Sequence, residues 1–168
     1  ACAPAAERGV TLITAGANRG FAAGCNVGIA AAGAHYDYYW LLNTDTVVDA
    51  GALRALVARA AADPGLGLVG STLRYYRSPA IIQARAGARL APRMLSMRHI
   101  DEHRRIDAPL ADAHSVESAL AYVHGASMLV SRRFRAEVGP MQEDYFLYYE
   151  EFDWARRAAG RFRLGYAP

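Results

Sequence analysis

The chain is 168 residues long, 53% hydrophobic and 21% charged, and carries a formal net charge of +3. This length fits one domain, residues 1–168, with a sizeable core, and the composition is that of a globular protein. No apolar run is long enough to cross a bilayer as a helix. All 19 basic residues are arginines, scattered along the chain and accompanied by no recognised motif, so the sequence argues against nucleic-acid binding.

The first half of the chain alternates strand and helix signals. Residues 10–14 form a short β-branched run that predicts a strand leading into a loop. Residues 21–32 are rich in alanine and end at Gly33, which predicts a buried helix with a glycine cap. Residues 38–42 are apolar and aromatic throughout, as expected for a strand covered on both faces.

A second helix and a third strand follow. Asp49 is placed to cap a helix over residues 52–62, whose larger apolar side chains fall on one face. The pair Pro64-Gly65 ends that helix, and residues 66–73 predict a strand. This alternation predicts an α/β fold with a Rossmann-like, mainly parallel central sheet flanked by helices.

The periodicity dissolves over residues 74–118, where arginine, histidine, acids and prolines separate short apolar pieces. We expect one irregular excursion there, with a short hairpin around residues 82–90, and such segments are usually functional loops or disorder. Order resumes with a strand over residues 119–130 and a helix beginning near Arg132. A last helix is predicted over residues 150–159, where the next glycine stops it.

Cysteine and histidine patterns give no sign of a disulfide framework or a structural metal. The two cysteines, Cys2 and Cys25, are isolated, which favours a reducing cytosol. Among the histidines only His99 and His103 stand at a spacing that could share a metal on a helix, and the residues between them predict a loop. A zinc site there is the less favoured interpretation.

Asn43 and Asp45 follow directly on the strand predicted over residues 38–42. A carboxylate at the C-terminal end of such a strand lies where open α/β sheets bind ligands. A divalent cation that bridges two phosphates needs one or two carboxylates and otherwise keeps water or phosphate oxygens. Asp45 could supply one such ligand, whereas Asn43 suits a contact to ribose or phosphate. Equally, both residues could merely shape the turn before the next helix.

The segment from Asn18 to Asn26 is rich in glycine. Its glycines, Gly20 first, permit a tight turn and close packing of a helix, and Asn18 can hold an irregular backbone. A helix N-terminus near a diphosphate is the functional interpretation. Simple helix capping is the structural interpretation and, for this motif alone, the favoured one.

Three acids, Glu150, Glu151 and Asp153, lie within four positions at the start of the last predicted helix. Acids in a first turn are favoured by the helix dipole. The aromatic side chains that precede them have no such explanation, because a solvated helix start does not need an apolar wall. Carboxylates crowded against apolar surface and against each other have raised pKa values, which suits a general base.

Four motifs in this order and at this spacing resemble the inverting glycosyltransferases of family 2, which have the GT-A fold, and in particular their bacterial rhamnosyltransferase-like branch. Such proteins typically show Asn-x-Gly-Phe-Ala-x-Gly-x-Asn, Leu-Asn-x-Asp-Thr, Gly-Ala-x-Met-Leu-x-Arg-Arg and Phe-x-Tyr-Tyr-Glu-Asp-x-Asp-x-x-x-Arg. Here the motifs run from Asn18 to Asn26, Leu42 to Thr46, Gly125 to Arg133 and Phe146 to Arg156. The resemblance covers nearly the whole chain, from about Val10 to Pro168.

The resemblance implies roles on the donor side. Asp45 corresponds to the last acid of the family's Asp-x-Asp motif, which holds Mg²⁺ or Mn²⁺ on the diphosphate of the sugar nucleotide. Asn43 replaces the first acid and becomes a nucleotide contact. Asn18 and Gly20 fall in the glycine-rich motif and are counted with the donor-binding residues.

It also implies roles at the reacting centre. Gly125 and Ala126 correspond to the segment that lines the donor-sugar and acceptor pocket. Glu151 stands where the family has an aspartate, the base that deprotonates the acceptor hydroxyl. Because glutamate has the longer reach, Glu150 and Asp153 stay open as alternatives for the base.

The implied activity is inverting transfer of a sugar from a dTDP-, UDP- or GDP-linked donor to a saccharide or lipid-linked acceptor, in bacterial cell-surface polysaccharide synthesis. Rhamnose is implied only by the branch that the chain resembles. Residues 74–118 would then lie on the acceptor side. Nucleotide sugars are cytosolic, so the active site is expected to face the cytoplasm, with the protein free there or held peripherally at the inner face of the plasma membrane.

Two departures from the family pattern favour a different hypothesis. Family members begin with a strand and loop that bind the base and ribose, and residues 10–14 match the second strand of that fold, so the first strand is missing. Relatives also continue beyond Pro168. We therefore expect a fragment or a degenerate copy of a longer enzyme. The alternative function is a non-catalytic binding domain that keeps the cleft. A nucleotidyltransferase is less favoured, because the chain lacks its glycine-rich, basic N-terminal loop.

Overall fold

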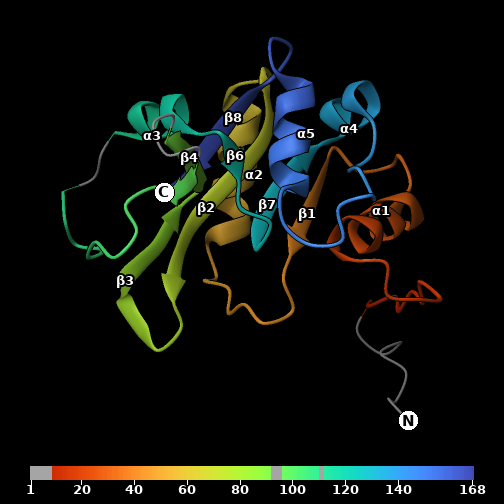
Figure 1. Ribbon diagram of the computed structural model, residues 1–168, viewed down its shortest axis with the longest axis horizontal. Coiled ribbons are helices and arrows are strands. Elements are labelled where there is room, and N and C mark those ends of the chain that lie inside the picture. Colours follow the sequence, from red (N-terminus) through yellow and green to blue (C-terminus); the bar gives the residue numbers. More distant parts are fainter. Residues whose placement is uncertain (1–8, 92–95, 110–111) are drawn as a thin grey trace.

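The computed structural model describes residues 9–91, 96–109 and 112–168, so Cys2 lies outside the described residues. The helices are α1 (Phe21–Ala32), α2 (Ala52–Ala62), α3 (Ala113–Ala119), α4 (Arg132–Val138) and α5 (Glu150–Ala158). The strands are β1 (Tyr38–Leu42), β2 (Leu66–Tyr75), β3 (Ser78–Arg85), β4 (Gly87–Ala91), β5 (Ser96–His99), β6 (Tyr122–Val123), β7 (Ser127–Ser131) and β8 (Arg163–Ala167). Figure 1 shows a central sheet flanked by helices, which confirms the predicted α/β class.

The central sheet has five strands in the order β1-β7-β2-β3, and β8 pairs with β2. The strands β1, β2 and β8 point the same way, because β1 and β2 are both antiparallel to β7 and β8 is parallel to β2. However, β7 lies antiparallel between β1 and β2, and β3 is antiparallel to β2. Of the described pairs in this sheet, only β2 with β8 is parallel. The predicted mainly parallel sheet is therefore wrong in one respect, because most of the described strand pairs in the sheet are antiparallel.

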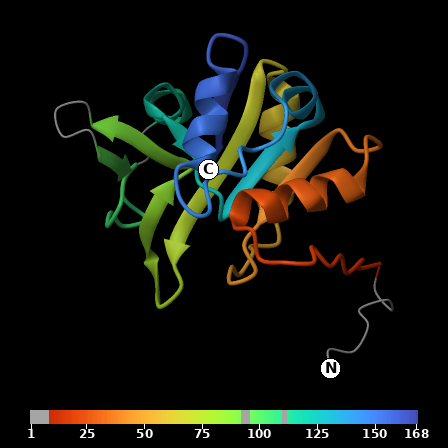
Figure 2. The ribbon, with the colours of Figure 1, turned by 45° about the vertical axis from the view of Figure 1, so that its right-hand side comes forward.

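Helices cover both faces of this sheet (Figures 1 and 2). On one face α1, α4 and α5 pack over a core that includes Phe134 and Trp154, whose rings meet edge to face at 5.1 Å. On the other face α2 packs through Leu56. The neighbours Met128 and Leu129 in β7 belong to opposite cores, because successive strand residues face opposite sides.

Several local predictions are confirmed. The bounds of α1, its cap at Gly33, the strand β1 and the bounds of α2 are as expected, and α5 ends one residue earlier than predicted. The predicted cap of α2 is wrong. The helix follows Gly51 without a side-chain cap, and the Asp49 carboxylate instead lies 2.7 Å from Arg74 on β2.

The strand predicted over residues 10–14 is wrong. This segment has no regular structure, and Val10, Leu12 and Ile13 are 56%, 74% and 42% exposed. In Figures 1 and 2 it runs outside the sheet, below α1. A β-branched run forms a strand only where its backbone finds a partner, and the described residues offer it none.

The irregular excursion predicted over residues 74–118 is also wrong, because β3, β4, β5 and nearly all of α3 lie in it. The hairpin expected near residues 82–90 does not form. Instead β3 pairs with β2, and β4 pairs with β5 and β6. The alternation of apolar and polar residues that indicates a strand cannot be recognised here, because some inward-facing side chains are charged. Arg85 faces inward at 1% exposure, with its guanidinium 2.8 Å from Asp101, so a buried position reads as a polar one.

The strand predicted over residues 119–130 is interrupted. The helix α3 extends to Ala119, β6 covers only two residues, and a turn at Gly125 separates it from β7. The sequence patterns do not predict the last strand, β8. It binds β2 in parallel across about 100 residues of sequence, a distance over which local patterns carry no pairing information.

Candidate active site

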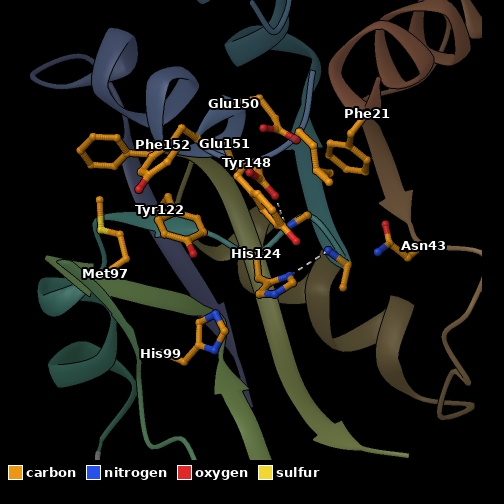
Figure 3. A pocket seen from close by; sticks show the side chains of 14 residues that line it. Phe21, Asn43, Met97, His99, Tyr122, His124, Tyr148, Glu150, Glu151 and Phe152 are labelled. Atoms are coloured by element: carbon orange, nitrogen blue, oxygen red, sulfur yellow. Dashed lines mark hydrogen bonds between the residues drawn. The ribbon is translucent and has the colours of Figure 1, made fainter. Parts of the chain in front are cut away.

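A cavity of about 410 Å³ lies beside the start of α5 (Figure 3). In the small sheet β5-β4-β6 the strand β4 lies between β5 and β6, and across it the rings of His99 and His124 meet with their centres 5.3 Å apart. The cavity is lined by aromatic, apolar and acidic side chains and by the turn before β7: Phe21, Asn43, Met97, His99, Tyr122, His124, Gly125, Ala126, Leu147, Tyr148, Tyr149, Glu150, Glu151 and Phe152.

The chain reaches α5 through an unusual backbone. Tyr148 and Tyr149 both have φ of 72°, in the left-handed region that is uncommon for residues other than glycine. Each such residue costs ~1–3 kcal/mol, and this kind of strain gathers at binding and catalytic sites. α5 begins directly after these two residues, and its first residues, Glu150 and Glu151, line the cavity.

Glu151 has the geometry of a general base. Its Oε1 accepts a hydrogen bond of 3.1 Å from the backbone N–H of Gly125. Burial, and to a lesser degree the charge of Glu150, raises the pKa of the Glu151 carboxyl above its usual range. A carboxylate with this increased proton affinity, facing a cavity, is suited to take a proton from a bound hydroxyl.

The other two acids of the cluster have different surroundings. Glu150 is 1% exposed, and its Oε2 has no hydrogen-bond partner among the described residues. Burial and the charges of Glu151 and Glu150 raise the pKa of the neighbouring Cys25 thiol to about 12, which keeps the thiol protonated at neutral pH. Asp153 lies 2.7 Å from Arg157, one turn along α5, and does not line the cavity. These contacts favour Glu151 as the base, which stays a prediction.

A second, larger hollow of about 1000 Å³ adjoins the first and shares Asn43, His124 and Ala126 with it. Asp45 lines this second hollow just beyond the end of β1. Two arginines line it as well, Arg74 and the buried Arg85. The hollow thus holds the Asp45 carboxylate at the end of a strand together with two arginines that are themselves ion-paired, Arg74 with Asp49 and Arg85 with Asp101. Arginine donors and a carboxylate that can take a divalent cation are groups that suit a diphosphate.

Asp45 fits the role of a single metal ligand. It is exposed, and no ion pair or hydrogen bond of its carboxylate is found among the described residues. Among the described residues, no group of three His, Cys, Asp or Glu side chains, His99 and His103 included, is arranged to hold a metal ion by itself. A cation on a diphosphate needs only one or two protein carboxylates.

Asn18 and Gly20 lie outside both hollows, where α1 begins. The Asn18 Oδ1 accepts a hydrogen bond of 3.1 Å from the Gly20 N–H, and Phe21 N–H binds the Phe146 carbonyl at 3.3 Å. Gly20 has φ of 91°, and a Cβ there would overlap the Phe146 carbonyl. These contacts join α1 to the aromatic segment before α5, which is a structural role. Their donor-binding role stays a prediction.

Replacing Gly20 with alanine is expected to destabilise the protein by ~1–3 kcal/mol, because a left-handed backbone and a close carbonyl both exclude a side chain. Gly24 in α1 is the matched control, since a Cβ there meets no atom within 4 Å. Gly24→Ala should stabilise the protein by about 1 kcal/mol through helix propensity. Urea unfolding of both variants measures the difference, and equal stability would contradict the close approach.

Several residues of this site do not stand out in the sequence. His124 and His99 look like two of several scattered histidines, and Met97 and Tyr122 belong to no catalytic pattern. Tyr122 lies close enough to Glu151 that burial, with the charges of Glu151 and Tyr149, raises the pKa of its hydroxyl to about 12. The sequence contains one indication of His124, which directly precedes the Gly125-Ala126 pair of the third family motif.

Comparison with known families identifies the class of protein. Glycosyl transferase family 2 matches residues 2–133, well over half of the chain. The chain belongs to this family. Its reaction is glycosyl transfer, which needs a nucleotide-sugar donor and an acceptor, and its mixed α/β architecture is consistent with the family's fold.

The family match includes Asp45 and the Gly125-Ala126 turn, and it ends before the carboxylates of α5. A search among curated proteins found no match. Within the described residues of this glycosyltransferase, no helix is long and apolar enough to cross a membrane.

Proposed function

We propose that this family 2 glycosyltransferase transfers a hexose, rhamnose in the branch it resembles, from a nucleotide diphosphate to a saccharide or lipid-linked acceptor with inversion at the anomeric carbon. The observation that carries the proposal is the placement of Glu151. Its carboxylate is partly buried, has a raised pKa and faces a cavity that continues past Asn43 into the hollow of Asp45. The proposed base, Glu151, therefore lies in the smaller cavity, and the proposed metal ligand, Asp45, lies in the larger hollow that adjoins it.

The donor would lie in the larger hollow. Asp45 would hold Mg²⁺ or Mn²⁺, which neutralises charge on the departing diphosphate. Arg74 and Arg85 line the same hollow, each beside the aspartate with which it pairs. Asn43 lies where the two hollows meet, in reach of both a nucleotide and its sugar.

The acceptor would lie in the smaller cavity, with its hydroxyl at Glu151. The acceptor oxygen attacks the anomeric carbon from the face opposite the diphosphate, so the new glycosidic bond forms as the bond to the diphosphate breaks. The hydroxyl proton passes to the Glu151 carboxylate, and the diphosphate leaves with the bonding electrons. A single displacement of this kind inverts the anomeric centre and forms no covalent enzyme intermediate.

Residues 74–118 supply the acceptor side of this proposal. Met97 and His99 of β5 line the cavity that contains Glu151. A cytoplasmic active site serving bacterial cell-surface polysaccharide synthesis, with peripheral attachment at the inner face of the membrane, is the setting that we propose. Hydrogen exchange tests the acceptor assignment, because amides of β5 should gain protection when acceptor is added and stay unchanged when nucleotide alone is added.

Calorimetric titration of UDP, GDP and dTDP, each with Mn²⁺ and with EDTA, tests the donor site. We expect one of the three nucleotides to bind, with an affinity that depends on Mn²⁺, because an anionic diphosphate needs a counter-ion beside Asp45. Identical heats with Mn²⁺ and EDTA would contradict the metal assignment. Binding of nucleotide without turnover of any sugar donor would support the alternative, a binding domain that has lost its activity.

A further inference from the structure

The turn between β6 and β7 stands at the junction of the two hollows. It runs from His124 to Ser127, and the Ser127 N–H binds the His124 carbonyl at 3.3 Å. A second hydrogen bond of 3.1 Å joins the Ala126 N–H to Nδ1 of the His124 ring (Figure 3). The imidazole therefore closes the turn from inside the cavity, through a bond between residues two apart in sequence.

This bond fixes the state of the His124 ring. A backbone N–H can only donate, so Nδ1 must be the unprotonated nitrogen and the neutral ring must carry its proton on Nε2. Burial, and then the nearby His99, lowers the pKa of His124 to about 4. Nδ1 is consequently an acceptor throughout the neutral pH range.

The same turn contacts both the proposed base and the end of β1 that leads to Asp45. The Gly125 N–H binds Glu151 Oε1 at 3.1 Å, and the Ala126 carbonyl accepts from the Asn43 N–H at 3.1 Å. Asn43 stands two residues before Asp45. A Cβ at Gly125 would overlap Glu151 Oε1, so the turn and the carboxylate approach as closely as a glycine permits.

We propose that His124 is a positioning residue: its Nδ1 locks the turn that holds the Gly125 N–H on the Glu151 carboxylate and the Ala126 carbonyl on the end of β1. The inference rests on the proposed function for the role of Glu151. Charged and titratable groups face this ring from three elements, namely His99 of β5, Tyr122 of β6 and Glu151 of α5. Within the turn, the bond from Nδ1 to Ala126 is the one that a side chain makes, beside the backbone bond from Ser127 to His124.

Two substitutions separate this role from simple filling of space. Asparagine carries an acceptor that commonly binds the N–H two residues further on, so His124→Asn can keep the bond to Ala126. His124→Leu fills similar space and removes the acceptor. We expect kcat to fall about tenfold in His124→Leu with KM nearly unchanged, and to stay within about twofold of the natural protein in His124→Asn, because one hydrogen bond is lost only in the first. His114→Leu, on the exposed part of α3, is the control.

A second measurement does not depend on turnover. Titration of the Glu151 carboxyl by NMR should show its pKa raised further in His124→Leu, because the Gly125 hydrogen bond that lowers it is lost. His124→Asn and His114→Leu should leave that pKa unchanged. Hydrogen exchange of the Ala126 amide should likewise quicken only in His124→Leu.

The outcomes distinguish this inference from the proposed function. Lack of transfer by the natural protein with every donor would contradict the proposed function, while the Glu151 titration would still decide whether His124 positions that carboxylate. Equal Glu151 pKa values in His124→Leu and His124→Asn, or a proton found on Nδ1 of His124, would overturn the inference even in a fully active enzyme.

Discussion

Replacing Glu151 with glutamine is expected to lower kcat for sugar transfer by about 10²–10⁴-fold, the usual contribution of a positioned general base. Glutamine keeps the size of the side chain and an oxygen for the Gly125 N–H, so the site keeps its shape while the proton acceptor is lost. Steady-state kinetics with donor and acceptor measure the loss. KM should change little, because glutamine preserves the contacts of the bound state.

Asp153→Asn is the matched control for this prediction. The Asp153 carboxylate pairs with Arg157 at 2.7 Å on the same helix, so its loss should affect stability more than chemistry. A small change in kcat for Asp153→Asn beside a large one for Glu151→Gln identifies the base. A reversal of these two results would mean that the base has been misassigned, and Glu150→Gln completes the comparison within the cluster.

The raised pKa of Glu151 also predicts how pH acts on rate and stability. Transfer requires the carboxylate, so kcat/KM should fall as pH is lowered through a pKa above the usual carboxyl range. For stability the sign is opposite. Above the carboxyl's unfolded pKa the folded protein resists ionisation more than the unfolded chain does, so wild type loses stability as pH rises from the unfolded pKa to the folded pKa. Thermal melts should therefore show Glu151→Gln more stable relative to wild type at pH 7 than at pH 4.

Replacing Asp45 with asparagine is expected to remove Mn²⁺-dependent binding of nucleotide, with a loss of about 10²–10³-fold in affinity or rate, because a metal ion on a diphosphate contributes several kcal/mol. The exposed carboxylate has no other interaction to replace among the described residues, so the fold should be unaffected. Calorimetry with the nucleotide that wild type prefers measures the change.

Asp49→Asn is the control for charge in the same hollow. Asp49 also lines that hollow and is exposed, but its carboxylate pairs with Arg74 at 2.7 Å. Exposed pairs of this kind contribute roughly 0–1 kcal/mol, so this variant should bind nucleotide and Mn²⁺ almost as wild type does. Mn²⁺-dependent binding that survives in Asp45→Asn and disappears in Asp49→Asn would assign the metal to Asp49.

Local patterns in the sequence are enough to predict the elements that carry the site. The alanine-rich run that ends at Gly33, the apolar strand over residues 38–42 and the acids at the start of α5 all signal their structure within about ten residues. For this reason Asp45 and the acidic cluster stand out as candidates from the residue pattern alone. The family match over residues 2–133 confirms the class of enzyme that those motifs indicate.

The pairing of the strands depends on tertiary contacts. The run at residues 10–14 has strand propensity but finds no partner among the described residues, whereas β8 forms a strand because its backbone pairs with β2. Residues 74–118 look irregular because Arg85, an inward-facing residue, is charged. Its Nε donates to Asp101 and its Nη1 to Tyr166, two residues far from it in sequence. Pairing and charge compensation are set by distant residues, which no local window contains.

The amino-acid pattern is thus sufficient for the family, the order of the main helices and a short set of acids. It does not separate Glu151, which faces the cavity and the Gly125 N–H, from Asp153, which an arginine neutralises. Nor does it reveal His124, because a lone histidine acquires a role only through what surrounds it. Burial and directed hydrogen bonds distinguish chemically similar side chains, and both arise only when distant segments fold against each other.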